Sequence, residues 1–226
     1  MPHDDAGAGT DLHLIYPDPQ LDQRSAAAGS LRRLAHAFVR HRTDPETLAE
    51  IAAWAEGTAE QLEAGSAPVA RPADYFARRY TDPRPADGAE VMAFSDRAFS
   101  GPANPTAMEV DMRRHGDGVR AVVTFGAAFE SAPGRAHGGS VCAVVDDVLG
   151  YLMVCLGIAA YTARLEIDYR GGVPIDEPVS FEGRETRREG RKSHVELTVR
   201  AGDAPDAPPL IEASGLFVIV TADQLA

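Results

Sequence analysis

A continuous apolar segment, residues 141–160, constrains the fold more than any other feature of the chain. Its only charged residues are the adjacent Asp146 and Asp147. The segment is long enough to cross a bilayer, but each aspartate would cost about 2.5–3.5 kcal/mol at the centre of a spanning helix. We therefore expect a helix that is apolar on nearly every side and is wrapped by the rest of a protein core.

The segments around this helix have the pattern of strands. Two precede it, residues 108–112 and 119–125, and four follow it, residues 162–170, 178–188, 192–200 and 210–221. Strict alternation places Thr162 on the same face as Arg164 and Glu166. Strands that are grouped rather than alternating with helices indicate an α+β fold with an antiparallel sheet. A sheet wrapped around the helix is the simplest way to bury it.

The first 104 residues have a different character. Residues 1–25, rich in Asp, Gly and Pro, predict a mobile or loosely packed arm. Residues 30–64 predict two amphipathic helices that form a hairpin, with Thr43 as N-cap of the second helix and Glu46 completing a capping box. Aromatic side chains are the expected anchors of the Pro-rich connector that follows: Tyr75, Phe76, Tyr80, Phe94 and Phe99. We predict an N-terminal extension over residues 1–104 and a main domain over 105–226.

Charge and cysteine content narrow the functional class. The formal charge of −12 disfavours nucleic acids and anionic membranes as general partners. Cys142 and Cys155 would lie roughly 20 Å apart on one helix, too far to form a disulfide. There is no ligand spacing typical of zinc, and the acidic N-terminus lacks the apolar core of a signal peptide. We expect a cytoplasmic protein with no metal and no cofactor.

One constellation carries chemical content. His137, Gly138 and Gly139 directly precede the apolar helix, whose first-turn N–H groups and dipole could stabilise an oxygen that gains negative charge. A carboxylate in an apolar helix is expensive unless it is paired or functional. Oxyanion donors and a carboxylate about 10 Å further along the helix suit acyl-group chemistry. That spacing is long within one chain, and becomes reasonable if two chains each contribute half of a site.

These residues resemble a known family. The His137-Gly-Gly string, the apolar helix with Asp146 and the segment 162–170 look like a hotdog-fold acyl-CoA thioesterase of the PaaI-like branch of the 4-hydroxybenzoyl-CoA thioesterase superfamily. Residues 190–192 and 212–218 also fit that family's later strands. The resemblance covers roughly residues 105–221 and implies a hotdog fold, in which an antiparallel sheet wraps a long central helix. Here it would carry an N-terminal helical extension.

The resemblance also implies roles for individual residues. Asp146 would act as general base for water or as nucleophile, and the Gly138 and Gly139 N–H groups would polarise the thioester carbonyl. Thr162 would orient the carboxylate or the water. In this fold the carboxylate and the glycine loop come from different subunits, so a homodimer or a dimer of dimers is expected. Arg191 and Lys192 occupy a stretch that lies near the CoA phosphates in relatives.

Other interpretations of these residues remain open. His137 is expected to fix the loop by hydrogen bonds rather than transfer protons. Asp147 fits a helix-surface or dimer-contact charge, and Thr162 could be simply a strand residue. The basic run that includes Arg191 and Lys192 could be a solvated strand end. Ser131 stands where some relatives have Asn, which removes one polarising side chain.

The competing function is a non-catalytic hotdog protein that binds or senses acyl-CoA. A hydratase or dehydratase is disfavoured because its usual Asp and His pair is missing near the helix start.

Overall fold

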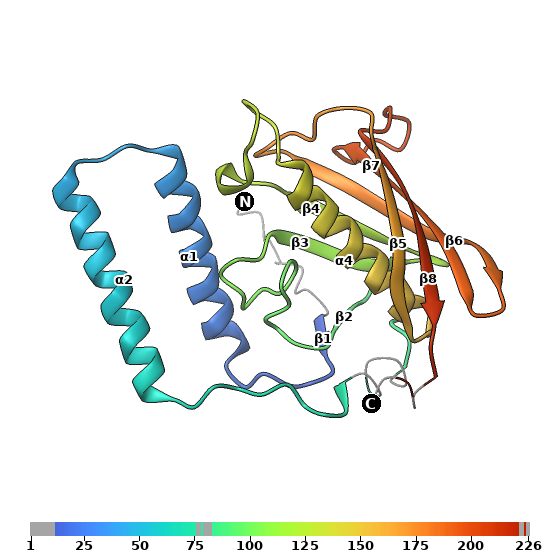
Figure 1. The fold of residues 1–226 in the computed structure, drawn as a ribbon, viewed down its shortest axis with the longest axis horizontal. Helices are drawn as coiled ribbons and strands as arrows, with labels where there is room; N and C mark the ends of the chain where they lie inside the picture. Colours follow the sequence, from blue (N-terminus) through green and yellow to red (C-terminus); the bar gives the residue numbers. More distant parts are fainter. Residues whose placement is uncertain (1–11, 76–77, 79–82, 222–223, 225–226) are drawn as a thin grey trace, which may run out of the picture.

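The computed structural model describes residues 12–75, 78, 83–221 and 224. A long helix, α4, lies in the curve of a six-stranded antiparallel sheet (Figure 1). The strand order is β3-β4-β6-β7-β8-β5, so β3 and β5 form the two edges. The strands are β3 (Glu109–His115), β4 (Gly118–Thr124), β5 (Ala160–Tyr169), β6 (Pro178–Glu189), β7 (Lys192–Ala201) and β8 (Ile211–Ile219). The predicted α+β hotdog architecture is confirmed.

Helix α4 spans Gly138–Leu156 and forms the centre of the core. Ten of its residues are buried, from Val141 to Cys155. By length and composition alone it could cross a membrane, but its apolar side chains pack on the inner face of the sheet. The helix ends at Gly157, whose φ of 65° is the left-handed conformation that glycine adopts readily.

The inner face of the sheet supplies the other half of the core. Residues on β7 alternate between buried and more exposed, with Val195, Leu197 and Val199 facing α4. Antiparallel pairing aligns β7 with both β6 and β8. The predicted strand alternation therefore holds across most of the sheet, and it positions the residues of the site described below.

The beginning of the chain is more ordered than the sequence predicts. Residues 1–11 lie outside the described part, but β1 (Leu12–Leu14) pairs in parallel with β2 (Glu90–Met92). Helix α1 (Leu21–Arg40) starts well before the expected residue 30. It packs on the short 3₁₀ helix η1 (Ala127–Phe129), where the Ala128 N–H donates to His36 Nδ1 at 3.0 Å. The expectation of a loose arm over residues 12–25 is therefore wrong.

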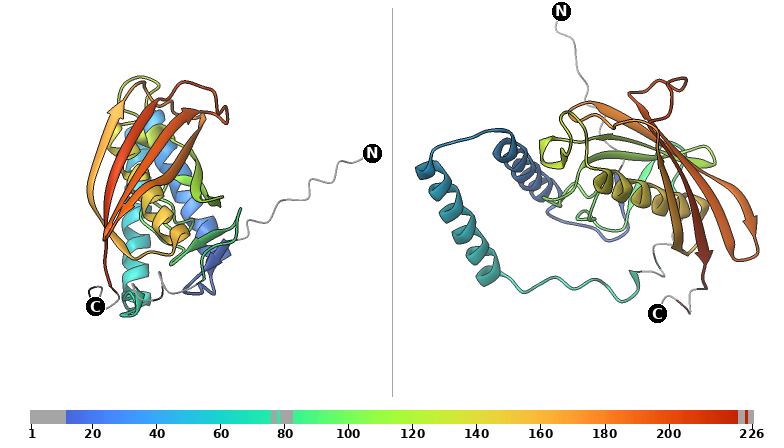
Figure 2. Two further views of the ribbon diagram at one scale, coloured as in Figure 1. Left: turned by 90° about the vertical axis from the view of Figure 1, so that its right-hand side faces the viewer. Right: turned by 45° about the horizontal axis from the view of Figure 1, so that its top comes forward.

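The second helix, α2 (Pro45–Gly65), stands away from the body (Figure 2). Its N-cap is Asp44 rather than the expected Thr43: the Asp44 carboxylate accepts the Thr47 N–H at 2.9 Å, and Pro45 fits the first helical position. None of its residues is buried. The predicted helices exist, but α2 does not pack as a closed hairpin on α1.

The connector joins the core of the main domain. Val91 and Ala93 are buried in one cluster with α4 residues, and Ile15 joins them from the segment after β1. Phe94 stacks between Tyr16 and Tyr75, with ring centroids 4.9 and 5.2 Å apart. These aromatic residues anchor the connector as predicted.

The remaining expected anchors do not add to this cluster. Phe99 is 40% exposed and does not belong to the buried cluster around α4. Phe76 and Tyr80 lie outside the described residues. The domain boundary predicted between residues 104 and 105 stays a prediction. Buried residues on both sides of it, such as Val91 and Met108, belong to one core.

Candidate active site

The structure brings Asp146 of α4 and Thr162 of β5 together. The Thr162 hydroxyl donates to Asp146 Oδ1 at 3.0 Å. Both side chains are exposed in the isolated chain, so the carboxylate is reachable from outside. A carboxylate held by one hydroxyl, with its second oxygen open, can accept a proton from water or attack a carbonyl carbon.

A bulge in β5 makes this contact possible. The register against β8 shifts between Thr162 and Arg164: Thr162 pairs with Phe217, whereas Arg164 pairs with Leu216. Phe217 is a core residue, so Thr162 faces the helix, while Arg164 lies on the opposite face. The expectation that these two β5 residues share a face is therefore wrong, because the extra residue of a bulge re-aims the side chains before it.

The Asp146–Thr162 pair lines a cavity of about 390 Å³. Helix α4 and the start of β5 form one side of it. The connector forms the other side through Arg71, Tyr75, Phe94, Arg97 and Ala98. The N-terminal extension thus contributes part of the wall around the candidate carboxylate.

Asp147, the next residue on α4, has different surroundings. It forms an ion pair with Arg97 of the connector, in which both side chains are about 15% exposed. Its other oxygen, Oδ2, is buried and accepts no hydrogen bond from the described residues. The expectation of a helix-surface charge is wrong, since the side chain ties α4 to the connector. The alternative of a dimer-contact charge stays a prediction.

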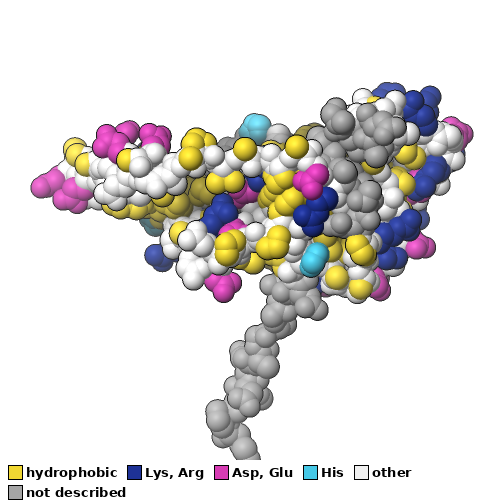
Figure 3. Space-filling view, turned by 90° about the horizontal axis from the view of Figure 1, so that it is seen from below, with side chains coloured by type: hydrophobic (Ala, Val, Ile, Leu, Met, Phe, Trp, Pro, Cys, Tyr) yellow, Lys and Arg dark blue, Asp and Glu magenta, His cyan; other side chains and the backbone are white. Residues whose placement is uncertain are grey.

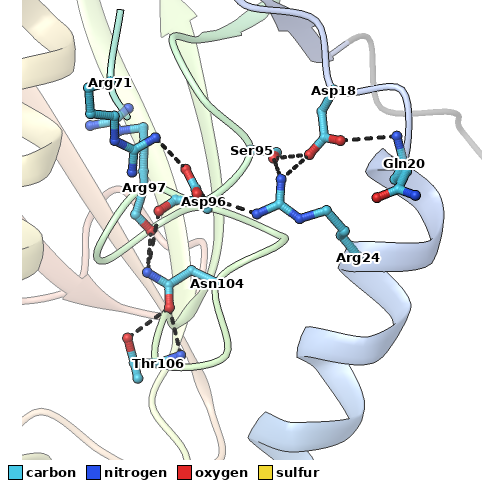
Figure 4. Close-up of polar contacts among 9 residues, drawn as sticks. All are labelled: Asp18, Gln20, Arg24, Arg71, Ser95, Asp96, Arg97, Asn104 and Thr106. Carbon is cyan, nitrogen blue, oxygen red and sulfur yellow. Dashed lines mark hydrogen bonds and ion pairs between the residues drawn. The ribbon is translucent and has the colours of Figure 1, made fainter. Parts of the chain in front are cut away.

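Arg97 belongs to a loop that is held by a polar network (Figure 4). Asn104 Nδ2 donates to the Arg97 carbonyl at 3.2 Å, and Asp96 pairs with Arg71 at 2.7 Å and Arg24 at 3.4 Å. Arg24 also pairs with Asp18 at 2.6 Å. These bonds fix the loop against α1 and position the connector side of the cavity.

The glycine segment forms the N-terminus of α4. His137 is the N-cap, and its Nδ1 accepts the Gly139 N–H at 3.0 Å. The histidine therefore holds the loop by a hydrogen bond, as expected. The same bond occupies the Gly139 N–H, one of the two groups expected to polarise a carbonyl. The Gly138 N–H has no acceptor among the described residues.

Tyr169, a residue that the sequence did not single out, braces this N-terminus. Its hydroxyl donates to the Gly138 carbonyl at 3.0 Å and lies 2.8 Å from Cys142 Sγ. Burial raises the pKa of Tyr169 to about 12, so the hydroxyl stays protonated near neutral pH. Cys142 is thus in a polar contact rather than purely a packing residue, whereas Cys155 is buried as expected.

The two halves of the candidate site lie apart on one helix. Gly138 and Asp146 are eight residues apart, a rise of roughly 12 Å. A thioester carbonyl cannot contact both at once. The Asp146–Thr162 pair and the Gly138 N-terminus are therefore two separate places on α4.

The basic residues at the end of β6, in the following turn and at the start of β7 differ in their bonding. Arg187 and Arg188 pair with Glu189 and Glu185, and Arg191 Nε donates to the Ile219 carbonyl at 2.9 Å. Lys192 is exposed and forms no ion pair with the described residues. It aligns with Val218, which in turn aligns with Tyr161 beside Thr162. Two strand spacings put Lys192 roughly 10 Å across the sheet from Tyr161.

Within the part of the chain that the structure describes, no three His, Cys, Asp or Glu side chains cluster in a way that could hold a metal ion.

Comparison with known proteins identifies the class. Residues 133–207 match the family model described as the thioesterase superfamily. The crystal structure of protein RHA08564, a thioesterase superfamily protein, superposes with a TM-score of 0.72 and 26% identity, over 86% of this chain and 90% of that chain. The chain therefore has the hotdog fold, and its residues 133–207 are similar to the thioesterase superfamily, which confirms the predicted resemblance to hotdog-fold thioesterases.

The chain is also similar, over part of its length, to curated proteins whose names state an activity. The acyl-coenzyme A thioesterase THEM4 of Bos taurus is 33% identical over 107 residues, which cover 46% of this chain and 43% of the relative. The THEM4 protein of Xenopus laevis is 31% identical over 93 residues, 41% of each chain. The matched region thus spans less than half the length of these relatives.

Proposed function

We propose that the protein hydrolyses an acyl-CoA thioester to the free acid and CoA. Two curated relatives that are 31–33% identical to part of this chain are named acyl-coenzyme A thioesterases. The observation that carries the proposal is the Asp146 carboxylate, held by the Thr162 hydroxyl in a cavity at the surface of the chain.

In the general-base route, Asp146 takes a proton from water as the water oxygen bonds to the thioester carbon. Thr162 keeps the carboxylate oriented toward that water. The carbonyl oxygen gains negative charge, which an N–H at a helix N-terminus stabilises. The C–S bond then breaks, the CoA thiolate takes up a proton, and the acid leaves. In the nucleophilic route Asp146 itself bonds to the carbon, the C–S bond breaks and the CoA thiolate leaves and takes up a proton. Water then hydrolyses the resulting anhydride to the free acid and regenerates the Asp146 carboxylate.

The complete site in this proposal uses two copies of the chain. One copy contributes Asp146 and Thr162, and the other contributes Gly138, whose N–H has no acceptor in the chain that the structure describes. The roughly 12 Å between these two half-sites supports this arrangement. So does the position of β5, which carries Thr162 and Tyr169 at an open edge of the sheet.

In the same proposal Lys192 and Arg191 bind the phosphates of CoA. Lys192, the only lysine of the chain, is exposed and forms no ion pair with the described residues, so its charge is available to attract an anion. The strand register puts Lys192 two strands from Tyr161, the neighbour of Thr162, with its side chain on the outer face of the sheet, away from α4.

A panel of short, medium, long and aryl acyl-CoAs, with detection of the released thiol, tests the proposal. We expect hydrolysis of at least one class, and at least a hundredfold loss of turnover in Asp146→Asn. Asp117→Asn, in the exposed turn between β3 and β4, is the matched control and should keep full activity. Tight binding of CoA esters with no thiol release from any of them would instead support the non-catalytic acyl-CoA-binding alternative.

A further inference from the structure

The last turns of helix α1 meet the body of the protein beside the N-terminus of α4. The two helices of the extension project from one side of the body (Figure 3), and α1 packs against it. Its contact is with η1, the three-residue helix that precedes the loop leading into α4 (Figure 1). The extension therefore reaches the glycine end of α4 as well as the cavity around Asp146.

His36 of α1 caps η1. The first N–H groups of a helix have no partner within it, and a polar side chain at the N-cap position commonly accepts one of them. The N-cap of η1 is Gly126, which has no such side chain. Instead the Ala128 N–H donates to His36 Nδ1 at 3.0 Å, and the His36 ring makes a T-shaped contact with Phe129, with ring centroids 5.8 Å apart. A side chain from the extension thus supplies the missing cap.

Gly126 makes this contact possible. A Cβ at this position would lie 2.5 Å from the His36 ring, closer than real Cβ contacts come. The Gly126 backbone has a φ of −92° and a ψ of 179°, a conformation that any residue adopts. The absence of a side chain therefore serves the approach of the ring rather than the conformation of the backbone.

Helix η1 in turn holds the residue that begins α4. The Phe129 carbonyl accepts the His137 N–H at 2.7 Å, and His137 is the N-cap of α4. Its neighbour Ala136 donates its N–H to the Val173 carbonyl at 2.9 Å, so the loop is held from two sides. The direction of the Gly138 N–H follows from the orientation of His137, because a planar peptide bond joins the two residues.

A second contact of α1 reaches the segment that includes Val173. Arg40 forms an ion pair with Asp176, whose N–H donates to the Phe125 carbonyl at 2.7 Å. The two side chains of the pair are 46% and 50% exposed, and an ion pair in water contributes little to stability. His36 is therefore the stronger of the two links between α1 and the start of α4.

We propose that His36 is a positioning residue for the Gly138 end of the candidate site, an inference that rests on the proposed hydrolysis. His36 touches no substrate. By capping η1 it keeps His137 in place, and His137 sets the direction of the Gly138 N–H, which stabilises the carbonyl oxygen of a thioester at Asp146 of a second copy. The extension then serves both ends of the site, through the connector at the Asp146 cavity and through His36 at Gly138.

Leucine and asparagine at position 36 separate the hydrogen bond from the packing. Both side chains branch at Cγ, but only asparagine has an oxygen that can accept in place of Nδ1. In His36→Leu we expect kcat to fall about tenfold while KM changes little, because an oxyanion donor acts mainly on the transition state. His36→Asn should keep most of kcat. Equal losses in the two variants, or no loss in either, would overturn the proposal.

Two further variants control for the place of the change. Gly126→Ala alters the opposite side of the contact and should reproduce the loss of kcat in His36→Leu, because its Cβ displaces the His36 ring. Ala37→Leu adds the same leucine at an exposed neighbouring position of α1 and should keep full activity. Circular dichroism checks that all four variants are folded under the assay conditions. Full activity in Gly126→Ala would contradict the proposed link.

Hydrogen exchange of the full chain tests the link without turnover. We expect residues 127–139 to exchange several times faster in His36→Leu and Gly126→Ala than in the unmodified chain, and at the unmodified rate in His36→Asn. If the unmodified chain hydrolyses no acyl-CoA, the proposed function fails, and these exchange rates still decide whether His36 holds this segment. Unchanged exchange in His36→Leu would overturn the positioning role whatever the activity.

Discussion

Asp146 and Asp147 are adjacent in the chain, yet their side chains have different surroundings. Asp146 is exposed and accepts a hydrogen bond from Thr162, whereas Asp147 is mostly buried in an ion pair with Arg97. Consecutive helix positions differ by about 100° in direction, so the sequence shows that the two point apart. It does not show which one meets the connector, because Arg97 is 50 residues away in sequence.

Removing the Thr162 hydroxyl tests its role as a positioning residue. Thr162→Val keeps the shape of the side chain but cannot donate to Asp146. We expect kcat to fall about tenfold, because a hydrogen bond to a charged group contributes about 1.5–3 kcal/mol. KM should change little. Thr162→Ser should restore most of the rate in the same steady-state assay. Equal rates for the Val and Ser variants would show that the hydroxyl is dispensable.

Glu90 is a buried carboxyl whose protonation affects stability. Burial and the charge of Asp111 raise its pKa from 4.5 to about 7, and Arg113 and Arg97 offset this only partly. Between these two pKa values the unfolded chain loses the proton while the folded chain keeps it. Stability therefore falls as pH rises from about 4.5 to about 7, by roughly 3 kcal/mol at 1.36 kcal/mol per pKa unit.

Glu90→Gln should remove this loss, because glutamine stays neutral. In urea unfolding we expect the variant to exceed the unmodified protein in stability at pH 8 and to match it near pH 4. All other titrating groups are the same in both proteins, so the difference between their free energies of unfolding reports the ionisation of Glu90 alone. A constant difference across this range would show that Glu90 is ionised in the folded state.

At the scale of elements, hydrophobic periodicity predicts most of the fold. The strands around α4 fall within a few residues of the predicted ranges. One face of each strand packs on the core, so apolar and polar residues alternate along its sequence and mark its extent. The bulge in β5 could not be predicted, since Thr162, Ala163 and Arg164 continue a regular pattern. It depends on pairing with Phe217 and Leu216 of a strand distant in sequence.

The C-terminus of α4 depends on one glycine. Gly157 has a positive φ, and a Cβ there would also meet the Arg84 side chain. Gly157→Ala should lower the free energy of unfolding by about 1–2 kcal/mol, because an L-residue disfavours the left-handed region. Gly65→Ala is the matched control at the end of α2, where a Cβ meets nothing within 4 Å. Thermal unfolding should show a lower Tm for the first variant only.

At the scale of the whole molecule, the sequence predicts a site divided between chains, but not the contribution of the extension. The His137-Gly-Gly string and Asp146 lie close enough in sequence to be found by their spacing. Arg71, Tyr75 and Arg97 come from an irregular connector with no periodic pattern, so nothing local marks them as cavity residues. Their placement depends on the β1–β2 pairing and on the polar network of residues 18–106.

Mixing two inactive chains tests the division of the site. Asp146→Asn removes the carboxylate half-site. Gly138→Val disturbs the glycine half-site, because a side chain there would meet the Tyr169 hydroxyl at 3.0 Å. Each variant alone should be nearly inactive. After the two are mixed under conditions that exchange subunits, half of the dimers contain both chains, and each such dimer has one intact site. We expect about a quarter of the unmodified activity to return.

A mixture of Asp146→Asn with Thr162→Val is the matched control, since both changes fall in the same half-site. Mixed dimers of this pair contain no fully intact site, so the activity should not exceed the average of the two separate variants. Recovery by the first mixture alone requires Asp146 of one chain to work with the Gly138 N-terminus of another. Absence of recovery despite proven subunit exchange would place both groups of a working site in one chain, in conflict with their separation along α4.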